Sequence, residues 1–238
     1  MRRVGIAMLQ GARHEHLEAL QNAADSIEVP IEVVQLRKAS DVCDIDALIL
    51  PGGESTAMRL ASAHERLLPA LFEWMLMHPK RPVLGTCAGA ILLANPELGF
   101  ESFMPIDVRR NGWGRQRNSF EAEVQLSQSF VDENATHSEN ASQTELALRD
   151  EYNHQPLLTR NDAKGAGLAS NSCAYPGVFI RAPRFELQEN SAPELEVIAT
   201  LEEEVVGVKL GKKIALTFHP ELTLDRRFHL WLLANIGE

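Results

Sequence analysis

The sequence has no run of apolar residues that approaches the roughly 18 needed to cross a membrane. Two arginines near the N-terminus precede a short apolar stretch at residues 4–9. This stretch is too short for the apolar core of a signal peptide and turns polar at Gln10. These absences argue against a membrane protein and against a secreted one, so we expect a cytoplasmic location and no contact with a membrane.

Cysteine is also scarce, with 3 residues among 238. The odd number and wide spacing of Cys43, Cys87 and Cys173 give no disulfide framework and no CxxC pair, which fits a reducing compartment. There is no basic run, and the formal net charge is −10, so we expect no binding to nucleic acid. The phosphate-loop pattern G-x-x-x-x-G-K-[ST] is absent. We expect neither a metal ion nor a cofactor.

The first half of the chain alternates apolar strands with helices, which is typical of a mostly parallel sheet covered on both faces. The expected strands are residues 4–9, 31–36, 45–50 and 82–84. The expected helical segments are residues 14–24, 56–77 with an interruption near Ala63 and His64, and 88–94.

The second half contains mainly strands, which favours an antiparallel extension of the same sheet. The expected strands are residues 104–108, 119–126, 177–180, 195–201, 205–210 and 213–217, followed by a closing helix at 224–236. Residues 127–172 are polar and lack a sustained apolar period, so we predict a flexible insertion there, with a short helix possible at 144–149. The whole chain, 1–238, is predicted to form one α/β domain.

The segment GTCAG, residues 85–89, has the form glycine–x–nucleophile–x–glycine directly after an expected strand. In the serine version of this motif, a sharp strand-to-helix turn exposes the nucleophile, and the next N–H helps to hold an oxyanion. Cys87 is therefore a candidate nucleophile, with Ala88 as a candidate oxyanion donor. The alternative is a packed cysteine in a glycine-rich turn.

A cysteine nucleophile needs a base, and the base needs an orienting partner. His219 lies in the segment FHPE after the strand at 213–217, and Glu221 follows two residues later. In an extended chain these two side chains would face the same side, which would complete a triad. The alternative is a surface turn. The histidines that fall in helical stretches are expected on solvated faces: His14, His16, His64, His78 and His229.

The segment PGGES, residues 51–55, follows another apolar strand. Its two glycines offer backbone N–H groups close to a bound group, which suits an oxyanion hole and makes Gly53 a second candidate donor. The alternative is a turn that only ends the strand.

Motifs along nearly the whole chain resemble the class I glutamine amidotransferases, and most closely the glutaminase subunits of pyridoxal 5′-phosphate synthases. The matching segments are LQGA with EH at residues 9–16, LILPGGEST, GTCAGAILLA, RRNGWGRQ with SFEAE, GVFIRAP and FHPELT. The resemblance implies a three-layer, flavodoxin-like α/β sandwich. The segment 127–172 and a sparse link at 95–105 depart from the family pattern, but neither contains any of these motifs.

The resemblance also implies roles for individual residues. Cys87 would be the nucleophile of a triad with His219 and Glu221. Contacts with L-glutamine are implied for six residues, namely Gly53, Glu54, Ser55, Arg110, Ile180 and Arg181. Arginine and glutamate side chains suit the α-carboxylate and the α-ammonium of free glutamine.

By this resemblance the chain would hydrolyse L-glutamine and pass ammonia to a separate (β/α)₈-barrel synthase subunit in a hetero-oligomer. That subunit would make pyridoxal 5′-phosphate from a pentose phosphate and a triose phosphate. Two other functions compete with this one. The first is a cysteine peptidase or γ-glutamyl hydrolase on the same scaffold, and the second is a non-catalytic regulatory or structural subunit.

Overall fold

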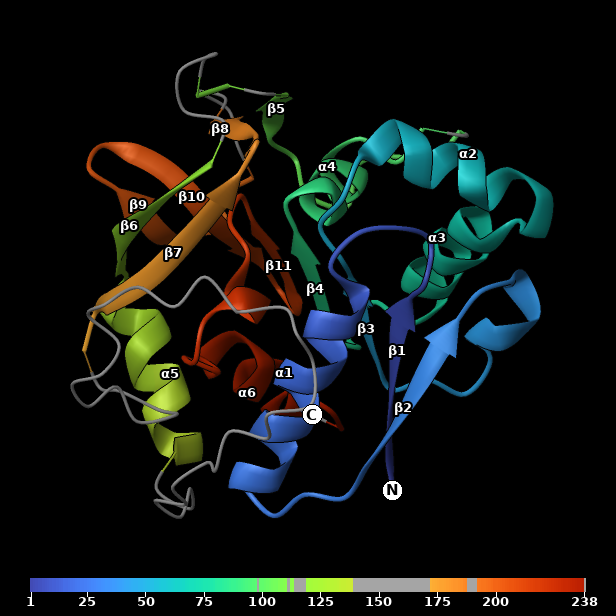
Figure 1. Cartoon of the computed structure of the whole chain (residues 1–238), viewed down its shortest axis with the longest axis horizontal. Helices are drawn as coiled ribbons and strands as arrows, with labels where there is room; N and C mark the ends of the chain where they lie inside the picture. The colour runs from blue at the N-terminus through green and yellow to red at the C-terminus, as the bar shows by residue number, and fades with distance from the viewer. Residues whose placement is uncertain (98, 111, 114–118, 139–171, 188–191, 238) are drawn as a thin grey trace.

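The computed structural model describes residues 1–97, 99–110, 112–113, 119–138, 172–187 and 192–237. A nine-stranded sheet runs through it in the order β2-β1-β3-β4-β11-β10-β9-β6-β7 (Figure 1). The first five strands in this order pair in parallel, as the alternating sequence pattern predicted. They are β2 (Ile31–Leu36), β1 (Arg2–Ala7), β3 (Ala47–Leu50), β4 (Val83–Thr86) and β11 (Lys213–Leu216).

The remaining four strands pair antiparallel and extend the sheet from β11, which confirms the predicted extension. These strands are β10 (Glu204–Leu210), β9 (Leu195–Leu201), β6 (Ser119–Leu126) and β7 (Ala174–Ile180). A second, two-stranded sheet pairs β5 (Asp107–Arg109) with β8 (Arg184–Glu186), a short strand that the sequence pattern did not predict.

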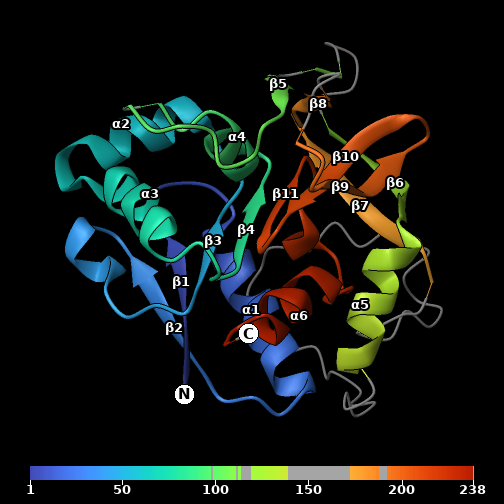
Figure 2. The ribbon, with the colours of Figure 1, turned by 180° about the vertical axis from the view of Figure 1, so that it is seen from behind.

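Helices cover both faces of the large sheet, so the molecule has the three layers expected from the sequence (Figures 1 and 2). On β3, Ala47 and Ile49 face one core, and Leu48 and Leu50 face the other. Strands buried on both sides in this way are characteristic of parallel sheets under helices. One face carries α1 (Arg13–Ser26), α5 (Gln128–Ser138) and α6 (Arg227–Ala234). The other carries η1 (Ala39–Val42), α2 (Ser55–Glu65), α3 (Leu67–Met77) and α4 (Ala88–Ala94).

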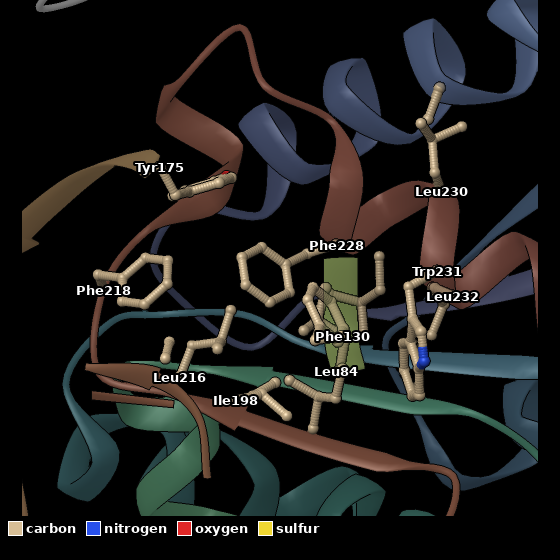
Figure 3. Close-up of a cluster of buried hydrophobic side chains, with 14 of the residues drawn as sticks. Leu84, Phe130, Tyr175, Ile198, Leu216, Phe218, Phe228, Leu230, Trp231 and Leu232 are labelled. Atoms are coloured by element: carbon tan, nitrogen blue, oxygen red, sulfur yellow. The ribbon is translucent and has the colours of Figure 1, made fainter. Parts of the chain in front are cut away.

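Helix α5 corrects the prediction that a flexible insertion begins at residue 127. Its Phe130 ring stacks on Phe228 of α6, with centroids 5.1 Å apart, inside the core shown in Figure 3. Trp231 Nε1 also donates a hydrogen bond to Glu133 Oε1 (3.1 Å). The sequence pattern was too weak to show this helix, because Phe130 and Val131 are its buried apolar anchors in an otherwise polar stretch. The rest of the predicted insertion, including the short helix at 144–149, falls on 139–171, outside the described residues.

The order of the central strands brings three sequence motifs to one edge of the sheet. Strands β3, β4 and β11 are parallel neighbours, so their carboxyl ends lie side by side. The segments PGGES, GTCAG and FHPE follow these three strands. Such an edge is where α/β sheets bind their ligands. Among the described residues, no helix is long and apolar enough to cross a membrane.

Candidate active site

Cys87 lies on a sharp turn between β4 and α4. Its backbone has φ 48° and ψ −105°, a conformation that side-chain-bearing residues rarely adopt. Its N–H donates to the carbonyl of Leu216 on β11 (2.8 Å), which fixes the turn against the sheet. Local strain of this kind is concentrated at functional sites, where the surrounding structure enforces it. The turn therefore has the geometry of a nucleophile elbow.

The glycines on either side of Cys87 allow close packing around this turn. A Cβ on Gly89 would lie 1.9 Å from the carbonyl oxygen of Leu50, so only glycine lets α4 approach β3 this closely. A Cβ on Gly85 would lie 2.6 Å from Cδ1 of Leu93 and 3.0 Å from backbone atoms of Gly89. The GTCAG spacing is thus explained by the packing of a strand, a turn and a helix.

His219 lies beside Cys87 and is almost fully buried. Its backbone N–H donates to the carbonyl of Val178 on β7 (2.8 Å), and its Nδ1 is 2.6 Å from Oε1 of Glu221. The structure therefore places the side chains of Cys87, His219 and Glu221 next to one another. The carbonyl of Glu221 accepts a hydrogen bond from the buried Arg226 guanidinium (3.4 Å), which helps to hold this loop.

The predicted contact between His219 and Glu221 is right, but the predicted backbone is wrong in one respect. Residues Pro220–Leu222 form a short 3-10 helix, η2, rather than continuing the extended chain. His219 precedes this helix with φ −109° and ψ 87°. Proline supplies the fixed φ of a first helical position, and the tight turn brings the Glu221 carboxylate back to the imidazole.

The charges in this group suit an acid–base pair. Burial disfavours a charged imidazole, but the Glu221 carboxylate and the Cys87 thiol outweigh it and raise the pKa of His219 to about 10. Burial likewise opposes ionisation of Glu221, but the imidazoles of His16 and His219 outweigh it and lower the pKa of that carboxyl group. An imidazolium beside sulfur can hydrogen-bond to a thiolate, the nucleophilic form of cysteine.

The two candidate oxyanion donors belong to segments next to the nucleophile. Ala88 is the first residue of α4, and the first N–H groups of a helix have no partner within the helix. The Gly52 carbonyl accepts a hydrogen bond from Ala12 N–H (3.1 Å), which fixes the peptide that joins Gly52 to Gly53. A Cβ on Gly11, where φ is +88°, would lie 1.8 Å from that same carbonyl oxygen. The LQGA segment therefore packs directly against the candidate oxyanion loop.

Glu54 and Arg110 come together at the start of α2. The Glu54 carboxylate caps the helix by accepting hydrogen bonds from the backbone N–H groups of Thr56 (3.0 Å) and Ala57 (2.6 Å). These hydrogen bonds, with a smaller contribution from Arg110, lower the pKa of Glu54. Arg110 donates to Thr56 Oγ1 (3.2 Å). Ser55 is buried as the first residue of the helix.

Ile180 and Arg181 reach the site from the end of β7. The Ile180 carbonyl lies 3.9 Å from Cys87 Sγ, so this backbone position borders the nucleophile directly. Arg181 follows with a positive φ of 44° and an exposed side chain. Within the part of the chain that the structure describes, no group of three or more His, Cys, Asp or Glu residues is placed to hold a metal ion.

Two histidines that were predicted on solvated faces are instead fully buried at the site. His16 Nε2 lies 3.3 Å from Glu221 Oε2, and His16 Nδ1 lies 3.1 Å from His229 Nε2. The prediction was right for His14 and His64, which are exposed. A signal for His16 was present, since it is spaced three and four residues before the buried Ala19 and Leu20.

Comparisons with known proteins agree with this geometry. A family model described as "SNO glutamine amidotransferase family" matches residues 6–162 and 161–238. The first match ends and the second begins at residues 161–162, inside the segment 127–172. Among curated relatives, "Pyridoxal 5'-phosphate synthase subunit PdxT" of Thermococcus gammatolerans is 36% identical over 239 residues, covering 98% of each chain. The protein of the same name from Pyrococcus horikoshii is 33% identical over 240 residues, covering 98% of this chain and 99% of the relative.

Two solved structures match this chain over nearly its whole length. A structure titled "Crystal structure of glutamine amidotransferase" is 30% identical, with a TM-score of 0.68 and 99% of both chains covered. A chain of "Structure of PurLQS from Thermotoga maritima" is 14% identical with a TM-score of 0.57, and this likeness concerns the fold alone.

Proposed function

Since the chain belongs to the SNO glutamine amidotransferase family, we propose that it hydrolyses the side-chain amide of L-glutamine to glutamate and ammonia. The observation that carries the proposal is the elbow that places the buried Cys87 beside His219, whose Nδ1 is 2.6 Å from Glu221. This arrangement is a nucleophile, a base and an orienting carboxylate, as acyl transfer from an amide requires.

In the proposed reaction, the Cys87 thiolate attacks the side-chain carbonyl carbon of glutamine. The N–H groups of Gly53 and Ala88 stabilise the negative charge that develops on the carbonyl oxygen. His219 gives its proton to the amide nitrogen, which leaves as ammonia, and a γ-glutamyl thioester remains on Cys87. His219 then takes a proton from water, the hydroxide attacks the thioester, and glutamate leaves as the thiolate is restored.

The residues around Cys87 suit the two charged groups of free glutamine. We propose that Arg110 and Arg181 face the α-carboxylate and that Glu54 faces the α-ammonium. Backbone groups of Ile180 and residues Gly53 and Ser55 would complete the pocket. The proximity of Glu54 and Arg110 at one helix terminus supports this grouping. A site built on such charges favours free glutamine over a glutamine inside a peptide.

We further propose that ammonia passes directly to a barrel-shaped synthase subunit that makes pyridoxal 5′-phosphate. The names of the curated relatives support a subunit of such a synthase. In this arrangement the chain itself binds neither the sugar phosphates nor the product. The synthase would dock near the opening above Cys87, because ammonia must leave there without reaching bulk water.

Glutamine hydrolysis by the purified chain should rise when the synthase subunit is added. One oxyanion donor is worth about 10²–10³ in rate, and the carbonyl of the Gly52–Gly53 peptide accepts a hydrogen bond from Ala12 N–H. A docking partner can therefore control the rate through this peptide. The measurement is glutamate release with and without the synthase subunit. Equal turnover in a correctly assembled complex would contradict control by the partner.

Replacing Gly52 with alanine should lower glutamine turnover by about 10²-fold, because small displacements of catalytic groups have effects of this size. The new Cβ would lie 2.3 Å from Cε1 of His219 and 3.2 Å from Cβ of Cys87, so the imidazole must move. The matched control is Gly211→Ala, at a turn with φ +54° where nothing lies within 4 Å. The control should lower the melting temperature and leave turnover unchanged. Wild-type turnover in Gly52→Ala would show that His219 is not held as described.

A further inference from the structure

A histidine from α1 occupies the side of Glu221 that faces away from His219. His16 is fully buried, and its Nε2 lies 3.3 Å from Oε2 of Glu221, while Oε1 of the same carboxylate is 2.6 Å from His219. The two carboxylate oxygens of Glu221 thus face one imidazole each. Helix α1 packs against α6 (Figures 1 and 2) and against the short helix η2.

The charge states decide which nitrogen of His16 carries a proton. Burial lowers the pKa of His16 and lowers the pKa of His229 well below its ordinary value, so both imidazoles are neutral at pH 7. Glu221 is ionised and can only accept. His16 must therefore carry its single proton on Nε2, the nitrogen that faces Glu221 Oε2 and lies 3.1 Å from Thr86 Oγ1.

His229 fixes this tautomer from the other side. With Nε2 of His16 protonated, its Nδ1 is a bare acceptor, 3.1 Å from Nε2 of His229. His229 therefore donates from Nε2 to His16. Its own Nδ1 has no hydrogen-bond partner among the described residues, as expected for the unprotonated nitrogen of a neutral imidazole. Donation thus runs from His229 to His16, whose protonated Nε2 lies 3.1 Å from Thr86 Oγ1 and 3.3 Å from Glu221 Oε2.

We propose that His16 is a positioning residue that holds the second oxygen of Glu221 and so fixes the carboxylate that orients His219. This inference rests on the proposed glutaminase function and adds a fourth side chain to the triad. Oε2 of Glu221 is buried and forms no hydrogen bond of good geometry within the described residues, so the His16 N–H, with Nε2 at 3.3 Å, steadies it by electrostatic attraction. Without this N–H the carboxylate is free to turn away from His219.

A neutral donor suits this position better than a cation would. A lysine or arginine at the same place would neutralise Glu221, and the carboxylate would then stabilise a protonated His219 less. An apolar residue would leave Oε2 without a nearby N–H. The imidazole of His16 supplies an N–H dipole close to Oε2 and leaves the negative charge of Glu221 available to His219.

The test compares His16→Leu, which removes the donor, with His16→Gln, which keeps an N–H near the position of Nε2. In the complex with the synthase subunit, His16→Leu should lower kcat about 10- to 100-fold with little change in KM, and His16→Gln should recover most of that loss. The matched control is His14→Leu, an exposed position on the same helix, which should keep wild-type kcat. Wild-type kcat in His16→Leu, with Cys87→Ser inactive, would overturn the inference and leave the glutaminase function standing.

A double-mutant comparison shows whether His16 acts through Glu221. If it does, adding His16→Leu to Glu221→Gln should cause little further loss of kcat. Multiplication of the two single effects would instead mean that His16 acts independently, which contradicts the proposal.

Nuclear magnetic resonance of the histidine-labelled wild-type chain and its variants gives a readout that does not depend on activity. His16 should be a neutral imidazole protonated on Nε2, and the His219 Nδ1–H signal should change in His16→Gln or His16→Leu but not in His14→Leu. A cationic His16, the opposite tautomer or an unchanged His219 signal would refute the proposal.

Discussion

Changing Cys87 to serine should lower glutamine hydrolysis by roughly 10³-fold or more while the fold stays intact. Serine keeps the size and the turn geometry, but its hydroxyl is a far weaker nucleophile in a site where an imidazolium faces the attacking atom. The measurement is glutamate release by the assembled complex, with circular dichroism and melting temperature as checks on folding.

The chain offers two matched controls for this substitution. Cys43 is exposed and Cys173 is half-buried, and serine at either position should keep wild-type turnover. Assaying free glutamine beside γ-glutamyl and glutamine-containing peptides separates a glutaminase from a peptidase or a γ-glutamyl hydrolase on the same scaffold. Activity retained in Cys87→Ser would remove Cys87 from its role, and a preference for peptides would refute the glutaminase function.

Replacing His219 with asparagine should be almost as damaging as losing Cys87. His219 both donates a proton to the leaving ammonia and activates the water, so neither half of the reaction proceeds well without it. Glu221→Gln should cost less, since Glu221 orients His219 and transfers no proton. Steady-state kinetics of both variants in the complex measure these differences.

The double variant Cys87→Ser/His219→Asn tests whether the two side chains act as one unit. Members of a catalytic unit are strongly non-additive, so the double variant should be little worse than either single variant. A loss equal to the product of the two single losses would show that Cys87 and His219 contribute independently, against the proposed mechanism.

The positions of the main site motifs could be predicted because each follows a strand. Segments after β3, β4 and β11 must share an edge once these strands are parallel neighbours, and the apolar runs identified the strands. The pairing of His219 with Glu221 was also foreseen, although η2 rather than an extended chain brings them together. Short-range patterns were sufficient for these features.

His16 was missed because its environment comes from distant parts of the chain. Residues 14–24 were predicted to form a helix with His16 on a solvated face, but the buried stripe of α1 includes His16, Ala19 and Ala23. A polar side chain is buried there because Glu221 and His229, more than 200 residues away, supply its partners. Helix α5 was missed for a similar reason, since its stability depends on packing against Phe228 and Trp231 of α6.

The most direct test of the proposed mechanism is covalent labelling by a glutamine analogue that carries a diazo-ketone in place of the amide. The complex is treated with this reagent, digested, and mapped by peptide mass spectrometry, with and without excess L-glutamine. The account predicts a single modification on Cys87, proportional to the loss of glutamine hydrolysis, prevented by L-glutamine and greatly slowed in His219→Asn. Labelling at Cys43 or Cys173, or full activity after Cys87 is modified, would contradict it.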